Sequence, residues 1–332
     1  MRNTAAAASS STETSSSAAA ISSSAAAERW VDVIMFNDEA DMLRYRIRLH
    51  APFVSAIVVV ESTLTFSGKP KSLHAQRALQ DLSDTERAAI NISVVQVRFS
   101  AEERAARSPW VREVAQRRFV GSWIQANFAN HLVYLSDVDE LLDGRELRLH
   151  RPWAQSHECF RPTLRFYYYS EHCPRGLWSQ SLVFRTNSSF LRSSLAHGIQ
   201  LRADVSALHS LISRSCPRTS FLSGWHLSYA MPTAAILRKL RDFSHAHDGV
   251  VVRLLHEQDP ARVVEERVRS CSDIFERNGS VKKKYQGWHD SAFDGVLPWL
   301  SNWPYHPMAA APSSSQLATA RGTHSRVHAL RV

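Results

Sequence analysis

Alternating apolar and polar stretches mark the start of the patterned part of the chain. Residues 31–36 are mostly apolar and the triplet 37–39 is polar, which predicts a buried strand and a turn. The apolar residues that follow recur at the spacing of one helix face: Met42, Leu43, Ile47 and Leu49. Pro52 ends this helix, and a second apolar run, 56–60, stops at Glu61. The order strand, helix, strand predicts a parallel pair in an α/β sheet covered on both faces.

The same alternation continues to residue 140. Residues 92–97 read as a third strand, and Pro109 suits the first position of a helix that runs to about Asn127. A fourth apolar run, 131–135, leads directly into Ser-Asp-Val-Asp-Glu at 136–140. Ligands of open α/β sheets gather beyond the carboxyl ends of the strands. We therefore expect this sequence, the polar triplet 37–39 and Glu61 to share one crevice.

The pattern changes after Arg151. Strand-like stretches at 160–169, 181–185 and 221–229 precede a helix that starts after Pro232, and Asp259-Pro260 starts another. We expect a single domain over 30–307, made of a first half, 30–150, that carries the polar strand ends of the crevice and a second half, 151–307. Residues 1–29 are rich in Ala and Ser and are expected to be disordered, as is the tail 308–332.

Composition and charge limit the classes of binding partner that the protein can have. The net charge of +9 suits an acidic partner: nucleic acid, a membrane surface or a nucleotide diphosphate. The basic residues are not interleaved with aromatic residues as in nucleic-acid-binding modules, so we expect no nucleic acid. No apolar run is long enough for a transmembrane helix. The four cysteines permit three pairings, of which Cys159 with Cys173 joins neighbouring segments, and free buried thiols are the alternative.

Asp137 and Asp139 have the chemistry of a metal and diphosphate site. Residues at i and i+2 of an extended segment point to the same side. One carboxylate can then bind a divalent metal while the other orients the ribose or a metal-bound water, with Asp139 on the metal and Asp137 beside it. The alternative is structural, because Ser136 or Asp137 also suits the N-cap of a helix through Leu141 and Leu142.

Other polar side chains are candidates for the same crevice. Arg112, Gln116 and Arg117 lie on the helix before the Asp-Val-Asp sequence, where guanidinium groups suit phosphate oxygens. Glu61 suits a ribose or a base. His226 ends a strand-like stretch and is a possible third metal ligand, although a lone imidazole is also common in protein cores. Solvent-facing roles are the alternative for each arginine and for Glu61.

An ordered series of segments resembles glycosyltransferase family 17, the N-acetylglucosaminyltransferases that add the bisecting residue to N-glycans. Its motifs include Asn-Asp-Glu at 37–39, Ser-Asp-Val-Asp-Glu at 136–140, Gly-Trp-His-Leu-Ser at 224–228 and Lys-Leu-Arg-Asp-Phe-Ser-His at 239–245. The resemblance covers roughly residues 30–307, with further segments at 60–71, 112–117, 166–169, 271–275 and 297–298.

The resemblance implies a GT-A-like fold with a mixed, mostly parallel sheet flanked by helices. It makes 30–307 a single catalytic domain, with a nucleotide-sugar-binding half, 30–150, and an acceptor-side half, 151–307. It also implies UDP-N-acetylglucosamine as the donor, Mn²⁺ or Mg²⁺ as the cofactor, and inverting transfer to the β-linked mannose of a glycoprotein N-glycan in a β1,4 linkage. Animal members are held in the Golgi membrane by an anchor, which implies the Golgi lumen or membrane as the location. The residues expected to contact the donor are Asn37, Glu39, Glu61, Lys69, Arg112, Gln116, Arg117, Asp137 and Trp225. Those expected on the metal are Asp137, Asp139 and His226.

Inversion requires a general base that accepts a proton from the acceptor hydroxyl. Asp242 and Asp248, which follow the Gly-Trp-His segment, are the candidates, with Glu140 as a third possibility. Two alternatives to the main hypothesis remain. The enzyme could use another sugar or acceptor, or the chain could be an inactive glycan-binding relative.

Overall fold

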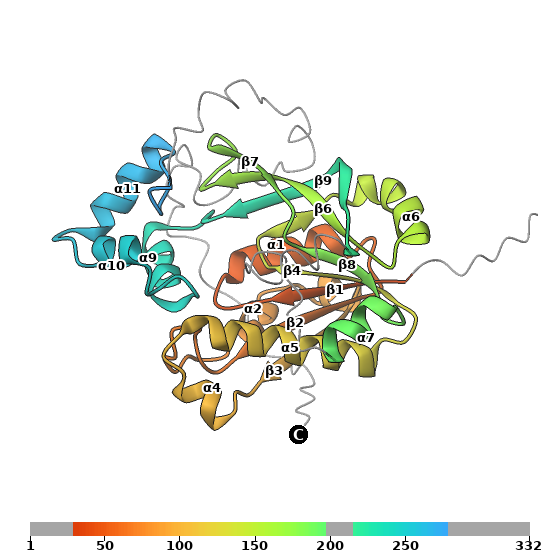
Figure 1. The fold of residues 1–332 in the computed structure, drawn as a ribbon. Coiled ribbons are helices and arrows are strands. Elements are labelled where there is room, and N and C mark those ends of the chain that lie inside the picture. Colours follow the sequence, from red (N-terminus) through yellow and green to blue (C-terminus); the bar gives the residue numbers. More distant parts are fainter. Residues whose placement is uncertain (1–28, 197–214, 278–332) are drawn as a thin grey trace, which may run out of the picture.

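One mixed sheet runs through the protein (Figure 1). The computed structural model describes residues 29–196 and 215–277. Within these residues, nine strands join in the order β3-β2-β1-β4-β8-β6-β9-β5, and β7 pairs with β6 outside this path. Strands from both halves of the chain therefore belong to the same sheet.

Four parallel strands form the N-terminal half of the sheet. β1 (Trp30–Met35) lies between β2 (Ala56–Ser62) and β4 (Leu132–Asp137), and β3 (Asn91–Val97) lies beside β2. All residues of β1 and β2 are buried, because helices cover both faces of the sheet. These strands confirm the predicted strand-helix-strand order and the α/β fold class.

The other five strands make the sheet mixed: β5 (Glu140–Leu142), β6 (Cys159–Tyr168), β7 (Pro174–Trp178), β8 (Leu182–Arg185) and β9 (Arg218–Ser228). β8 runs antiparallel to β4 and β6, whereas β9 runs parallel to β6. β5 pairs antiparallel with β9, so the alternative of a helix through Leu141 and Leu142 is wrong. At Gly224 the two strands are so close that an added Cβ would lie 2.0 Å from the Leu141 carbonyl oxygen.

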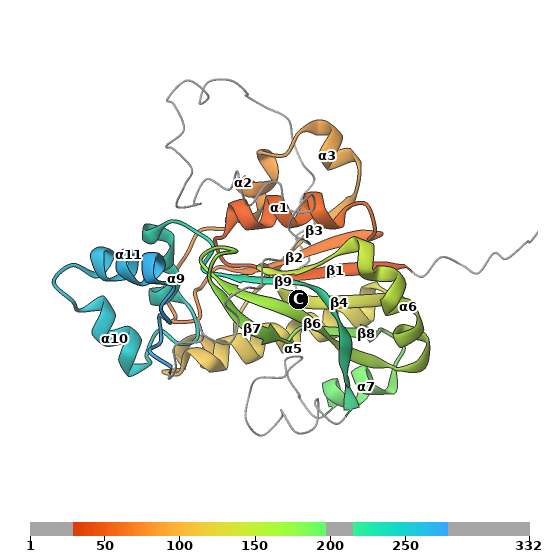
Figure 2. The same cartoon turned by 90° about the horizontal axis from the view of Figure 1, so that it is seen from above.

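Helices cover the two faces of the sheet (Figure 2). On one face lie α1 (Ala40–His50), α2 (Ala75–Gln80) and α3 (Asp84–Ala88), and on the other lie α5 (Pro109–Asn127) and α7 (Ser189–Ala196). Apolar side chains of α1, such as Leu43, pack with Ile34 and Ile57, whereas Ile124 of α5 packs with Val33. Among the described residues before β9, the other helices are α4 (Ala101–Ala105), a 3₁₀ turn (Gly144–Glu146) and α6 (Leu147–Ser156).

A third group of helices lies at the end of the sheet where β1 and β4 finish (Figure 1). It comprises α9 (Thr233–Asp242), α10 (Gly249–Leu255) and α11 (Pro260–Ser270). The two predicted starts are confirmed, because Pro232 is the N-cap of α9 and Pro260 is the first residue of α11. Apolar residues of this group pack against Tyr168 and Tyr229. The helices thereby stand over the polar strand ends.

Two disulfides join segments that are distant in sequence. Cys159 pairs with Cys216, and Cys173 pairs with Cys271. This is one of the three pairings that the sequence permits, and it excludes both a bond between Cys159 and Cys173 and the alternative of free thiols. β6 separates Cys159 from Cys173 by its whole length, and the parallel run of β9 brings Cys216 beside the start of β6. The second disulfide ties α11 to the connection between β6 and β7.

Three stretches lie outside the described residues: 1–28, 197–214 and 278–332. Nearly all of the N-terminal segment that is expected to be disordered therefore lies outside the described residues. So do two parts of the expected catalytic domain, 197–214 and 278–307, and the whole expected tail. Among the residues that are described, no helix combines the length and the apolar character that a bilayer crossing requires.

Candidate active site

An open cavity lies beyond the carboxyl ends of β1, β2 and β4, where the sequence predicts a crevice. Strand ends form one side, α5 and α9 contribute to its rim, and β6, β7 and β9 close the far side. The lining includes eight of the predicted site residues: Asn37, Glu39, Gln116, Arg117, Asp137, Asp139, His226 and Asp242.

Asp139 is buried next to two basic side chains. Lys239 Nζ, from α9, lies 3.0 Å from Asp139 Oδ2 and 3.2 Å from Glu39 Oε1. His226 Nε2, from β9, lies 3.5 Å from Asp139 Oδ1. Burial alone raises the pKa of the Asp139 carboxyl, but the charges of Lys239 and His226 outweigh it and hold the pKa well below its usual range. Asp139 is therefore ionised at neutral pH.

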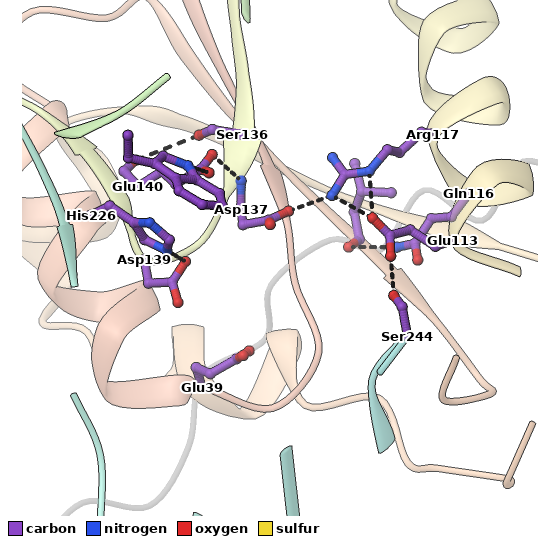
Figure 3. Close-up of polar contacts among 12 residues, drawn as sticks. Glu39, Glu113, Gln116, Arg117, Ser136, Asp137, Asp139, Glu140, His226 and Ser244 are labelled. Atoms are coloured by element: carbon purple, nitrogen blue, oxygen red, sulfur yellow. Dashed lines mark hydrogen bonds and ion pairs between the residues drawn. The ribbon is translucent and has the colours of Figure 1, made fainter. Parts of the chain in front are cut away.

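Asp137 belongs to a second polar chain that reaches the other rim (Figure 3). Arg117 Nη2, from α5, donates to Asp137 Oδ1 at 2.7 Å, and Arg117 Nε donates to Glu113 Oε1 at 3.2 Å. The Ser244 hydroxyl donates to the other oxygen of Glu113. This chain of contacts joins β4, α5 and the segment after α9, so the two rims of the cavity are held together by polar side chains.

The backbone of residues 136–140, which we call the D-x-D turn, is stabilised from within. Glu140 Oε2 accepts a hydrogen bond from the Asp137 amide at 3.0 Å, and Glu140 Oε1 accepts one from Trp178 Nε1 at 2.5 Å. Both carboxylate oxygens of Glu140 therefore have structural partners. Glu140 does not line the cavity, which separates it from Asp242 as a candidate base.

A buried charged network supports the D-x-D turn from behind. Asp32 of β1 accepts from Arg46 Nε at 2.9 Å and contacts His50 Nδ1 at 2.7 Å. Arg46 then donates to the Asp137 carbonyl at 2.6 Å and to Ser136 Oγ at 2.7 Å. Sequence reasoning missed this network. Its signal is a single Asp inside an apolar strand, together with Arg46 and His50 four residues apart on the next helix.

Aromatic side chains of β6, β7 and β9, and of the residue directly after β9, line the cavity. We call this set the aromatic wall: Phe166, Tyr168, Trp178, His226 and Tyr229. The His226 ring stacks on Phe166, with centroids 4.7 Å apart and planes 9° apart. The Trp178 ring centroid lies 4.5 Å from that of His226, with the planes 46° apart. These contacts fix the imidazole so that its Nε2 faces Asp139.

Two predicted contacts, Glu61 and Arg112, have structural partners outside the cavity. The Glu61 carboxylate accepts from Lys71 Nζ at 2.6 Å and from the first amides of α2, at His74 and Ala75. The Arg112 guanidinium donates to carbonyl oxygens of two loops, including Phe66 at 2.6 Å. Neither side chain lines the cavity. Their contacts order the loops that border it.

Three further predicted residues lie away from the cavity lining. Trp225 is fully buried in the core, because alternate residues of β9 face opposite sides and its neighbour His226 takes the cavity side. Lys69 is exposed, with its Nζ 3.7 Å from Asp242 Oδ1. Asp248 lies outside the lining and pairs with His245 Nδ1 at 2.7 Å. Of the two candidate bases, only Asp242 borders the cavity.

The donor atoms around Asp139 suit a divalent cation in part. Asp139 and His226 present a carboxylate and an imidazole to the cavity, and Asp137 stands two residues away. Within residues 29–196 and 215–277, no group of three or more His, Cys, Asp and Glu side chains is arranged to hold a metal. Mg²⁺ and similar ions commonly bind through one or two carboxylates plus substrate phosphates and water. The residues fit that kind of site.

Comparison with known families decides the class of this protein. A family model described as Glycosyltransferase family 17 matches residues 6–278. The chain belongs to glycosyltransferase family 17. The family that the sequence resembles is thereby confirmed, and the protein is a glycosyltransferase. Membership implies a nucleotide-sugar donor and a glycan acceptor.

Solved structures that are similar to this family 17 member include the following two. A 4-diphosphocytidyl-2C-methyl-D-erythritol synthase is 13% identical, with 64% of this chain and 97% of that chain covered and a TM-score of 0.37. The TarS 1-349 structure from S. aureus is 11% identical, with 83% and 77% covered and a TM-score of 0.35. No curated protein sequence matches the chain.

Proposed function

We propose that this protein transfers N-acetylglucosamine from UDP-N-acetylglucosamine to the β-linked mannose of N-glycans, inverting the anomeric carbon to form a β1,4 linkage with Mn²⁺ or Mg²⁺. One observation carries the proposal. The carboxylates of Asp137 and Asp139, the Arg117 guanidinium and the Asp242 carboxylate all border a single cavity that the aromatic wall also lines. The charged groups suit a nucleotide diphosphate, and the aromatic rings suit sugars.

The donor belongs at the strand ends. Asn37 and Gln116 offer amides near the ends of β1 and β2, and Arg117 offers a guanidinium for phosphate oxygens. Asp139 and His226 would hold the cation. When bound, the cation stabilises the negative charge that develops on the departing diphosphate. This placement leaves the aromatic wall beside the sugar ring of the donor and that of the acceptor.

The two disulfides support an oxidising compartment. Disulfides persist in secretory lumens and are rare in reducing compartments. Both join elements of the catalytic fold, and the second holds α11 to the sheet beside the cavity. We therefore propose the Golgi lumen or membrane as the location, which agrees with a glycoprotein acceptor.

Asp242 is our candidate for the general base. Its carboxylate borders the cavity, and burial raises its pKa, an effect that Lys69 partly offsets. A base must be deprotonated to act, so kcat/KM of the wild type should fall as pH falls through this raised pKa. We expect Asp242→Asn to lower kcat by about 10²- to 10⁴-fold and to abolish this acidic limb. UDP binding should change little. A steady-state pH profile and calorimetric UDP titration measure both quantities.

Asp248 provides the matched comparison. It is the other candidate from the sequence, but it pairs with His245 outside the cavity lining. Asp248→Asn should keep most of the turnover and the acidic limb. If instead Asp248→Asn loses turnover and Asp242→Asn retains it, the assignment of Asp242 is wrong.

Donor and acceptor are tested together by mass spectrometry. Purified protein is incubated with Mn²⁺, UDP-N-acetylglucosamine and a mixed pool of N-glycans, and we expect one added N-acetylhexosamine on glycans with an accessible β-linked mannose. Linkage analysis of the product should show a β1,4 bond. A parallel panel of UDP-sugars measures UDP release. Faster release from another sugar would contradict the donor, and nucleotide binding without transfer to any acceptor would indicate an inactive glycan-binding relative.

A further inference from the structure

Lys239 holds the carboxylate that the proposed function assigns to the cation. Its side chain comes from the last turn of α9, and its ammonium lies between Asp139 Oδ2 at 3.0 Å and Glu39 Oε1 at 3.2 Å. The Tyr229 ring centroid lies 5.4 Å from Nζ. All four groups line the cavity, so the ion pairs are made at its wall.

A divalent cation and this ammonium compete for the same negative charge. Like charges a few ångströms apart in a partly desolvated site repel strongly. Glu39, Asp139 and Lys239 carry two negative charges and one positive charge, so their balance is minus one. Adding a divalent cation alone changes it to plus one. A nucleotide diphosphate that arrives with the cation makes the balance negative again.

We propose that Lys239 is the resident counter-ion of Asp139, which disfavours binding of a free divalent cation and contacts the nucleotide diphosphate when cation and nucleotide bind together. The inference rests on the proposed function, because it takes Asp139 as the cation ligand. It assigns Lys239 a specific energetic role. Lys239 couples the two ligands, so that each binds more tightly in the presence of the other.

Arg117 and Asp137 form a similar ion pair at the other aspartate of the D-x-D turn. The Arg117 guanidinium lies 2.7 Å from Asp137 Oδ1 and also contacts Glu113. Asp137 and Asp139 therefore each have a basic partner that is suited to phosphate oxygens. Lys239 differs from Arg117 because its two partners both lie where the cation is expected. Its removal should therefore change cation affinity more than the removal of a surface charge does.

The test measures Mn²⁺ affinity with and without UDP. Free Mn²⁺ is followed by electron paramagnetic resonance during titration of the full chain. In the wild type, we expect saturating UDP to tighten Mn²⁺ binding at least about tenfold, which corresponds to a coupling free energy of about 1.4 kcal/mol. In Lys239→Met, Mn²⁺ alone should bind at least about tenfold more tightly than to the wild type, and the effect of UDP should be smaller. Lys239→Arg should restore most of the coupling.

Arg238→Met is the matched control, because it removes one positive charge from the neighbouring position of α9. Arg238 pairs with Asp38 and is half exposed. Its Mn²⁺ titrations should match those of the wild type. Equal affinity for free Mn²⁺ in the wild type and Lys239→Met would overturn the inference. The wild-type titrations keep it testable if Lys239→Met does not fold, because Mn²⁺ binding that is unaffected by UDP also overturns it.

Transfer assays separate this inference from the proposed function. A wild type that couples Mn²⁺ with UDP but adds no N-acetylglucosamine to any glycan contradicts the proposed function and leaves the inference standing. A wild type that performs the transfer without coupling contradicts the inference alone.

Discussion

Replacing Asp139 with asparagine should lower kcat for sugar transfer about a thousandfold and abolish metal-dependent UDP binding. The substitution keeps the shape of the side chain but removes the charge that would hold the cation, and stabilisation by a bound cation is worth several kcal/mol in the transition state. A factor of ten in rate corresponds to about 1.4 kcal/mol, so a loss of about 4 kcal/mol gives the expected decrease. Single-turnover kinetics and calorimetric UDP titrations with and without Mn²⁺ measure both effects.

Asp84→Asn is the matched control for this variant. Asp84 is an exposed residue of α3 that pairs with Arg87, and it does not line the cavity. Both variants should remain folded by circular dichroism. Turnover by Asp139→Asn close to the wild-type value would remove the D-x-D turn from the mechanism, whatever the metal requirement of the wild type.

The site residues at the strand ends could be predicted because each strand and its end are visible in a short stretch of sequence. Buried parallel strands are read from short apolar runs, and the carboxyl ends of such strands share one edge of the sheet. Asn37, Glu39, Asp137 and Asp139 follow directly from this rule, and all four line the cavity. The helix starts after Pro232 and at Pro260 were predictable for a similar reason, since proline marks the first turn of a helix.

The prediction failed where a side chain had a structural partner that is distant in sequence. Glu61 also ends a parallel strand, yet its carboxylate is taken by Lys71 and by the first amides of α2. No local sequence pattern distinguishes a glutamate that makes these structural contacts from one that binds a ribose. Trp225 and His226 are both buried. The difference in polarity between the two side chains therefore does not show which of them faces the cavity. Only the alternation of β9, set by its pairing with β5 and β6, decides between them.

The contact of Lys239 with Asp139 and Glu39 could not be predicted from the sequence, for a related reason. One lysine on an amphipathic helix normally indicates a solvent-exposed face. Its two carboxylate partners come from the ends of β1 and β4, far from α9 in the sequence. The same holds for the disulfides, since the pairing of Cys159 with Cys216 depends on the parallel run of β6 and β9.

Replacing Arg46 with methionine should lower the free energy of unfolding by about 3 to 5 kcal/mol at neutral pH. Arg46 and Asp32 are both fully buried, and removal of one partner leaves the other charge without compensation. The variant also loses the hydrogen bonds to Ser136 Oγ and to the Asp137 carbonyl. Urea denaturation followed by circular dichroism measures the loss. Arg44→Met, on the same helix but paired with exposed Asp81, should cost about 1 kcal/mol or less.

The pH dependence of unfolding distinguishes this network from simple packing. Burial tends to raise the pKa of Asp32, but Arg46 and His50 outweigh it, so that the pKa is lowered to about 2. A carboxyl with a lowered pKa contributes stability that is present above its unfolded pKa of about 4 and is lost as pH falls toward 2. The wild type should therefore lose stability across this window. In Arg46→Met the pKa of Asp32 rises because burial remains while the arginine charge is gone, so the stability that is lost between about pH 4 and about pH 2 should be smaller than in the wild type. An unchanged pH profile in Arg46→Met would show that Arg46 acts through its packing and not through its charge. In that case, Asp32 and Arg46 would support the D-x-D turn only by filling space behind it.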